Sequence, residues 1–119
     1  QARLSVATLD QIASAALYSV DSDYFDAVRK EYKLRRDTCY NKLLEIPGVV
    51  VKEPQGAFYM MVKAPGGDAH AFSERAKKEN LLLVPADSFG CPGFFRISTC
   101  VDPAMIQRSL PAFRRVLQD

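Results

Sequence analysis

The chain has 119 residues, a length typical of one domain that buries its own hydrophobic core. Hydrophobic residues make up 48% of the chain and charged residues 25%, as in an ordinary soluble globular protein. The formal net charge is only +2, which argues against nucleic acid and acidic membrane surfaces as partners. No apolar run is long enough to span a bilayer and no secretory leader is recognisable, so we expect a cytoplasmic protein.

The three cysteines predict free thiols. Cys39, Cys91 and Cys100 are odd in number and widely spaced, which is not the pattern of a disulfide framework. His70 is the only histidine, so these residues form no zinc site either. Free thiols are typical of the reducing cytoplasm.

Two helices are predicted at the N-terminal end. The first starts at Thr8, which has capping-box spacing to Gln11. Its apolar stripe consists of Leu9, Ile12, Ala13, Ala16, Leu17 and Val20. The second is predicted over about residues 24–46 and ends at Pro47. Its stripe consists of Phe25, Val28, Tyr32, Cys39, Leu43 and Ile46, with Arg35 between them.

The remaining sequence alternates between short apolar runs and helical patterns. Strands are predicted over residues 49–51, 57–62, 81–85 and 94–98. Asp68 can cap a helix that ends near Asn80, and Asp102 with Pro103 can start a final helix. The apolar face of that final helix consists of Ile106, Leu110, Phe113 and Leu117.

This order of elements predicts an α+β fold. We expect a two-layer sandwich in which helices cover one face of a small mixed or antiparallel sheet. A helical arm and one long helix precede the sandwich.

Residues with catalytic chemistry are scarce. The sequence around His70 does not suggest a nucleophile pair with a cysteine. Gly66 and Gly67 lack the following lysine and hydroxyl residue of a phosphate-binding loop. None of the seven lysines lies in an apolar strand end that would lower its pKa. We therefore expect no catalytic residue and no metal ligands in this chain.

Arg96 is the one candidate binding residue. It lies within the predicted strand 94–98, where alternation directs Phe95 and Ile97 to one face and Arg96 to the other. A planar guanidinium there can bind a planar anion through two parallel hydrogen bonds. From the residues alone, an ordinary ion pair with an acidic residue of the sheet or a solvated edge is the more common outcome.

Three motifs carry a resemblance to a known family. They are "QGAFYMMV" at residues 55–62, "LLLVPADSFG" at 81–90 and "GFFRIS" at 93–98. In this order they resemble the C-terminal domain of fold-type I pyridoxal-phosphate aminotransferases, with its Pro-x-Gly-x-Phe-Tyr strand, Pro-Gly-x-x-Phe-Gly loop and Arg-Ile strand. The leading "QARLSVATLDQIASAAL" and the long helix with "RRD" resemble the connection from the large domain. The pattern is similar to aspartate-type class I enzymes.

The resemblance implies a role for Arg96. In the family, the matching arginine binds the substrate α-carboxylate through a bidentate pair. Phe89 and Gly90 match a loop near the closing active site. The family commonly has glycine where this chain has Ala86, so alanine would be strained if a positive φ is required there.

The resemblance also implies a longer enzyme of aspartate-type or broad specificity. The lysine and the other residues that bind pyridoxal phosphate would belong to a large domain that precedes residue 1. We expect residues 1–22 to link to that domain and residues 23–119 to form the small domain. The full-length enzyme would be a homodimer acting on amino acids and 2-oxo acids. The 119-residue chain alone would bind no cofactor and would be inactive.

An alternative belongs to another class of protein. A stand-alone α+β module could bind a small anionic ligand or a partner protein without catalysis. Both possibilities give Arg96 an anion, so this residue does not separate them.

Overall fold

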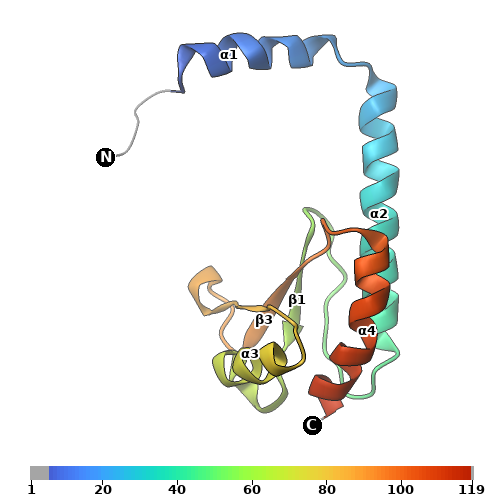
Figure 1. Cartoon of the computed structure of the whole chain (residues 1–119), viewed down its shortest axis with the longest axis vertical. Coiled ribbons are helices and arrows are strands. Elements are labelled where there is room, and N and C mark those ends of the chain that lie inside the picture. The colour runs from blue at the N-terminus through green and yellow to red at the C-terminus, as the bar shows by residue number, and fades with distance from the viewer. Residues whose placement is uncertain (1–5, 119) are drawn as a thin grey trace. The chain divides into compact units, whose positions relative to one another are not determined.

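The structure is a computed structural model that describes residues 6–118, and it divides the chain into two compact units. The first unit ends at Lys30 and the second begins at Glu31. In chain order the elements are α1 (Thr8–Ala15), the 3-10 helix η1 (Ala16–Ser19), α2 (Ser22–Leu44), β1 (Tyr59–Lys63), the 3-10 helix η2 (Pro65–Gly67), α3 (Ala69–Lys78), β2 (Val84–Pro85), the 3-10 helix η3 (Asp87–Phe89), β3 (Phe94–Ser98) and α4 (Pro103–Gln118). Figure 1 labels α1, α2, α3 and α4 with the strands β1 and β3.

In the first unit, α1 has the predicted apolar stripe but a different start. Its N-cap is Ala7, so Thr8 is already helical and the predicted capping box is wrong. The Gln11 amide instead donates to the Val6 carbonyl at 2.8 Å. No residue of α1 or η1 is buried, and the side chains of Leu9 and Ile12 are exposed.

Helix α2 begins and ends two residues before the predicted limits. Only the C-terminal half of its stripe reaches the core, because Cys39, Leu43 and the following Ile46 are buried. Phe25 and Tyr32, from the N-terminal half of the stripe, are exposed.

The sheet confirms the predicted α+β class. Its three strands are antiparallel in the order β1-β3-β2, so β3 is the central strand. Side chains alternate along β1 and β3, and one face carries the buried residues Met60, Val62, Phe95 and Ile97. Helix α3 packs on this face, where Phe72 stacks on Phe95 with ring centroids 4.6 Å apart.

The predicted strand at 49–51 is wrong. Only Val51 pairs with a strand residue, as an isolated bridge to Val62. The Lys63 amide also donates to the Val50 carbonyl at 2.9 Å. The segment therefore follows the edge of β1 briefly, and Pro54 soon removes the donor that further pairing would need.

The predicted buried strand at 81–85 is also wrong in extent, because β2 contains only Val84 and Pro85. Leu81, the first of the leucines before β2, instead forms part of the C-terminal cap of α3. Asn80 has a left-handed φ of 59°, and the Leu81 amide donates to the Ala76 carbonyl at 3.0 Å. These are features of a Schellman C-cap, in which the residue after the left-handed one packs on the helix. Leu81 is accordingly buried, whereas Leu82 is exposed.

The starts of the last two helices agree with the sequence. The Asp68 carboxylate accepts a hydrogen bond from the Ala71 amide at 2.9 Å, and Asp102 accepts one from the Ala104 amide at 2.7 Å. The apolar face predicted for α4 is confirmed: its buried residues include Ile106, Leu110, Phe113 and Leu117. Within residues 6–118, no helix is both long and apolar enough to cross a membrane.

Candidate anion-binding site

Arg96 lies in the middle of the central strand β3. Its register partners are Met61 on β1 and Val84 on β2. The neighbours Phe95 and Ile97 are buried in the core, whereas Arg96 is half-buried on the opposite face. The predicted alternation along this strand is therefore confirmed.

Two aromatic rings contact the guanidinium. The Arg96 Cζ lies 4.2 Å from the ring centroid of Tyr59 and 4.2 Å from that of Phe89. Tyr59 pairs with Ser98 across the sheet, so it stands diagonally to Arg96 on the same face. Phe89 ends the 3-10 helix η3, in the loop that precedes β3. Both distances are well inside the range of cation–π attraction.

No carboxylate of the described chain pairs with Arg96. Among residues 6–118, the salt bridges within 4.0 Å all involve other cations, and no hydrogen bond leaves the Arg96 side chain. Arg35 is the opposite case, since it donates to the Glu31 carboxylate at 2.7 Å and to the Val101 carbonyl at 2.9 Å. The ordinary ion pair within the sheet, considered above for Arg96, does not form.

This arrangement can bind a planar anion. Aromatic rings interact with the face of a guanidinium, whereas its N–H donors lie in its plane and point outward. The two rings also lower the polarity around the charge, which strengthens its attraction to an anion. A carboxylate that approaches in the guanidinium plane can accept two parallel hydrogen bonds.

The loop before β3 supports this site with unstrained backbone. Ala86 is buried and has a φ of −97°, so the strain considered for alanine at this position does not occur. Its amide donates to the Phe94 carbonyl at 2.8 Å, and its carbonyl accepts from the Cys91 amide at 3.1 Å. The left-handed residues of the loop are Gly90, with a φ of 72°, and Gly93, with a φ of 77°.

In the part of the chain that the structure describes, the histidine and the cysteines considered from the sequence form no hydrogen bond, ion pair or cation–π contact with Arg96. His70 is exposed, and its Nε2 lies 3.4 Å from an Asp87 carboxylate oxygen. All three cysteines are free. Within the described part of the chain, no three His, Cys, Asp or Glu side chains come together as metal ligands. Burial raises the pKa of the Cys39 thiol to about 11, so Cys39 is a core residue and not a nucleophile.

The lysines do not provide a site for covalent attachment of a cofactor. All of them lie at the surface of the described chain, and the half-buried Lys42 donates to the Glu45 carboxylate at 2.7 Å. A lysine that forms a Schiff base needs a desolvated environment that lowers its pKa. The described residues therefore do not fit the attachment of pyridoxal phosphate.

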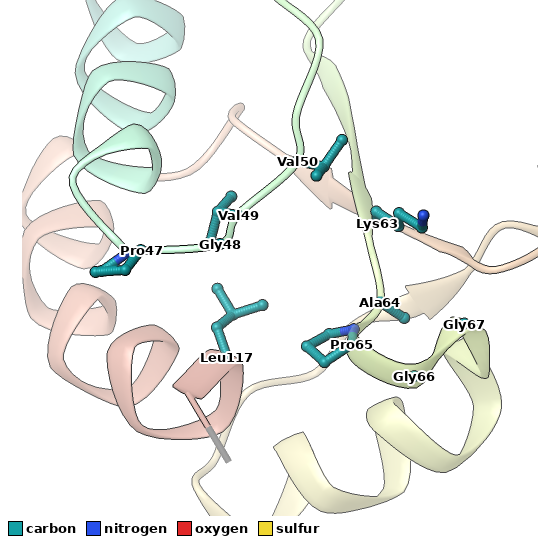
Figure 2. Close-up of a pocket in the computed structure, with 10 residues that line it drawn as sticks. All are labelled: Pro47, Gly48, Val49, Val50, Lys63, Ala64, Pro65, Gly66, Gly67 and Leu117. Atoms are coloured by element: carbon teal, nitrogen blue, oxygen red, sulfur yellow. The ribbon is translucent and has the colours of Figure 1, made fainter.

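Two pockets of the second unit lie apart from Arg96, which is not among their lining residues. One has a volume of about 470 Å³, and it lies between the segment after α2, the end of β1 and the end of α4 (Figure 2). Figure 2 shows Leu117 at its centre and the Lys63 side chain pointing away from Leu117. Another, of about 320 Å³, is lined mostly by apolar residues around Cys39, together with Asn80, Ser98 and Ser109. Lys63 is the only charged residue that lines either pocket, so neither offers the convergent charged groups expected of an amino-acid site.

Sequence reasoning did not identify Tyr59 as part of the site. Its position depends on the register between β1 and β3, which pairs Tyr59 with Ser98. The alternation of each strand was readable, but a register shift of one residue would have moved Tyr59 to the other face. Phe89 was matched to a loop near the site, but its contact with the guanidinium was not predicted.

Comparison with known proteins gives one family. The family "Aminotransferase class I and II" matches residues 3–113. Among curated relatives, an LL-diaminopimelate aminotransferase from Nitratidesulfovibrio vulgaris (strain Hildenborough) is 35% identical over 104 residues, covering 84% of this chain and 26% of that protein. An aspartate aminotransferase from Bacillus sp. (strain YM-2) is 29% identical, covering 93% of this chain and 30% of that protein.

Solved structures agree with these relatives. The crystal structure of an aspartate aminotransferase from Thermotoga maritima superposes with a TM-score of 0.83 at 30% identity, covering 96% of this chain and 29% of that one. An aminotransferase from Eubacterium rectale is 50% identical with a TM-score of 0.71, covering 75% of this chain and 22% of that one. The chain thus spans between a fifth and a third of the length of these proteins. On this evidence the chain belongs to the class I and II aminotransferase family.

Proposed function

We propose that this chain is the substrate-carboxylate-binding domain of a longer aminotransferase of aspartate-type or broad specificity. The full-length enzyme transfers an amino group between an amino acid and a 2-oxo acid. Family membership supports the reaction class, and aspartate aminotransferases occur repeatedly among the relatives and structural neighbours. The family match over residues 3–113 does not favour a stand-alone binding module.

The single observation that carries the proposal is the state of Arg96. Its guanidinium lies over two rings on the open face of the sheet, and no described carboxylate neutralises it. A charge that is partly removed from water without an ionic partner reduces stability unless it binds something. An amino-acid carboxylate supplies the missing anion, with charge-assisted hydrogen bonds of about 1.5–3 kcal/mol each.

Pyridoxal phosphate belongs to the proposal only for the full-length enzyme, where it would act as the electron sink of the transfer. Because the described lysines are at the surface, the residues that hold the cofactor would come from other parts of the enzyme. The 119-residue chain alone should then be inactive and should bind no cofactor. This domain binds the substrate carboxylate and closes over the site, which excludes water.

The same proposal includes the domain boundaries, the oligomeric state and the location of the full-length enzyme. Residues 1–22 would link it to the cofactor-binding domain and residues 23–119 would form the small domain. The enzyme would be a homodimer in the cytoplasm, a location that free cysteines suit.

Kinetics of the full-length enzyme test the role of Arg96. Arg96→Lys keeps the positive charge but loses the planar pair of donors, so we expect KM for the amino acid to rise at least tenfold. Arg96→Ala should raise it further. Arg108→Lys is the matched control, because Arg108 is exposed on α4, and its kinetics should equal those of the unmodified enzyme. Unchanged KM in Arg96→Lys would contradict the proposal.

A further inference from the structure

We infer that Tyr59 and Phe89 are positioning residues, which hold the Arg96 guanidinium ready for an incoming carboxylate. The inference rests on the proposed function, because it assigns these rings a part in binding the substrate through Arg96. Neither residue needs to touch the substrate.

The exposure of the two rings is the first observation. Tyr59 is 38% exposed and Phe89 is 49% exposed, so neither ring is a core residue. Aromatic side chains usually stabilise a fold by burying most of their large apolar surface. What these two rings share is the Arg96 guanidinium, at 4.2 Å from each centroid.

The rings also lie on fixed backbone. Tyr59 pairs with Ser98 in the sheet, and its ring packs on Phe58 with centroids 4.6 Å apart. Phe89 is held by the η3 turn, in which its amide donates to the Ala86 carbonyl at 3.0 Å. The next residue, Gly90, donates to the Asp87 carbonyl at 3.0 Å. Two elements far apart in the sequence therefore meet at one guanidinium.

Aromatic rings suit this task better than a carboxylate would. A carboxylate on the same chain would accept the N–H donors that a substrate needs, as Glu31 does for Arg35. Rings attract the cation through its face and accept none of these strong hydrogen bonds. The rings restrict the rotamers of the Arg96 side chain, so this side chain loses less conformational entropy when the substrate binds.

The test uses the full-length enzyme with Tyr59→Leu and Phe89→Leu. We expect each to raise KM for the amino acid about two- to ten-fold, the effect of ordering one free side chain on binding. Turnover should stay within about twofold, because the carboxylate contact is equal in substrate and transition state. The inhibition constant of a competitive carboxylate inhibitor should rise by the same factor as KM.

Three further variants make the test specific. Tyr59→Phe keeps the ring, so the KM of this variant should equal that of the unmodified enzyme. Tyr24→Leu is the matched control, since Tyr24 is a 60% exposed aromatic residue of α2 whose ring packs on Phe25 and not on Arg96. In an Arg96→Lys background, Tyr59→Leu should have little further effect, because the group that it positions is gone.

The outcomes separate this inference from the proposed function. If Arg96→Lys raises KM but the two leucine variants do not, the positioning role is wrong and the proposed function stands. The same conclusion follows if Tyr24→Leu raises KM as much as Tyr59→Leu, or if Tyr59→Leu acts equally in the Arg96→Lys background. If Arg96→Lys leaves KM unchanged, the proposed function itself is wrong.

Discussion

The guanidinium of Arg96 lies over the ring of Tyr59, with 4.2 Å between Cζ and the ring centroid, across the junction of β3 and β1. Arg35, by contrast, is bound by a carboxylate and a backbone carbonyl of its own chain. The two arginines thus have different roles: Arg35 holds parts of the fold together, whereas Arg96 keeps its donors available.

This difference predicts different effects on stability. Arg35→Met removes the hydrogen bond to the Val101 carbonyl and the pair with Glu31, so it should lower the free energy of unfolding by about 1–2 kcal/mol. Arg96→Met loses only contacts with two half-exposed rings and should change it by less than about 1 kcal/mol. Urea titrations of the two variants check this. A larger loss for Arg96→Met than for Arg35→Met would show that Arg96 is mainly structural.

Ala57 and Ala86 lie in the segments that precede β1 and β3, and their φ angles differ in sign. Substituting each with glycine therefore tests the backbone conformation beside the candidate site. Ala57 has a left-handed φ of 57°, so Ala57→Gly should relieve strain and raise the free energy of unfolding by up to about 1 kcal/mol. Ala86 has a φ of −97°, so Ala86→Gly should lower it by about 0.5–1 kcal/mol. Thermal unfolding of both variants measures whether each substitution raises or lowers stability. A change in the same direction for both would contradict these φ angles.

Gly93 marks a close approach between two loops. It has a φ of 77°, and a Cβ there would lie 3.0 Å from the Gly67 carbonyl oxygen. We therefore expect Gly93→Ala to destabilise the domain by about 1–3 kcal/mol. Gly56→Ala is the control, because a Cβ at Gly56 meets no atom within 4 Å, and it should have little effect on the unfolding midpoint.

Cys39 predicts a loss of stability at high pH. Burial raises the pKa of its thiol from 9.0 to about 11, so the folded chain keeps a proton that the unfolded chain loses. The resulting stabilisation is fully present below pH 9 and is lost as the pH rises towards 11, by an amount on the order of 3 kcal/mol.

The variant Cys39→Ala isolates this effect from other groups that titrate at high pH. It should be less stable than the unmodified chain at pH 8, because it leaves a cavity. Between pH 9 and 11, its free energy of unfolding should decline less than that of the unmodified chain. Parallel declines in urea titrations would show that the Cys39 thiol does not govern the pH dependence.

Much of the fold could be predicted because the local signals were strong. Alternation in "FFRIS" gave β3 with its correct faces, and Asp102 with Pro103 gave the start of α4. The strand predicted at 81–85 was mostly wrong because three leucines look alike in a strand and in a helix C-cap. Only the left-handed Asn80 and the contact of Leu81 with the end of α3 decide between the two.

The candidate site could be predicted only in part. Arg96 was identifiable as an arginine placed among apolar residues in a strand, and its side of the sheet followed from alternation. Its two rings were not, because Tyr59 reaches it through the strand register and Phe89 through the folding of a loop. Whether a carboxylate of the described chain reaches Arg96 depends on every segment that surrounds it in the fold, and a local sequence pattern does not predict this.

The most direct test of the account is a crystal structure of the full-length enzyme with a bound carboxylate analogue of the amino-acid substrate. We predict that two N–H groups of Arg96 donate to the two carboxylate oxygens, with distances of about 2.7–2.9 Å, while the rings of Tyr59 and Phe89 stay against the guanidinium. An analogue whose carboxylate is bound by other residues, with Arg96 turned away from it, would contradict the account.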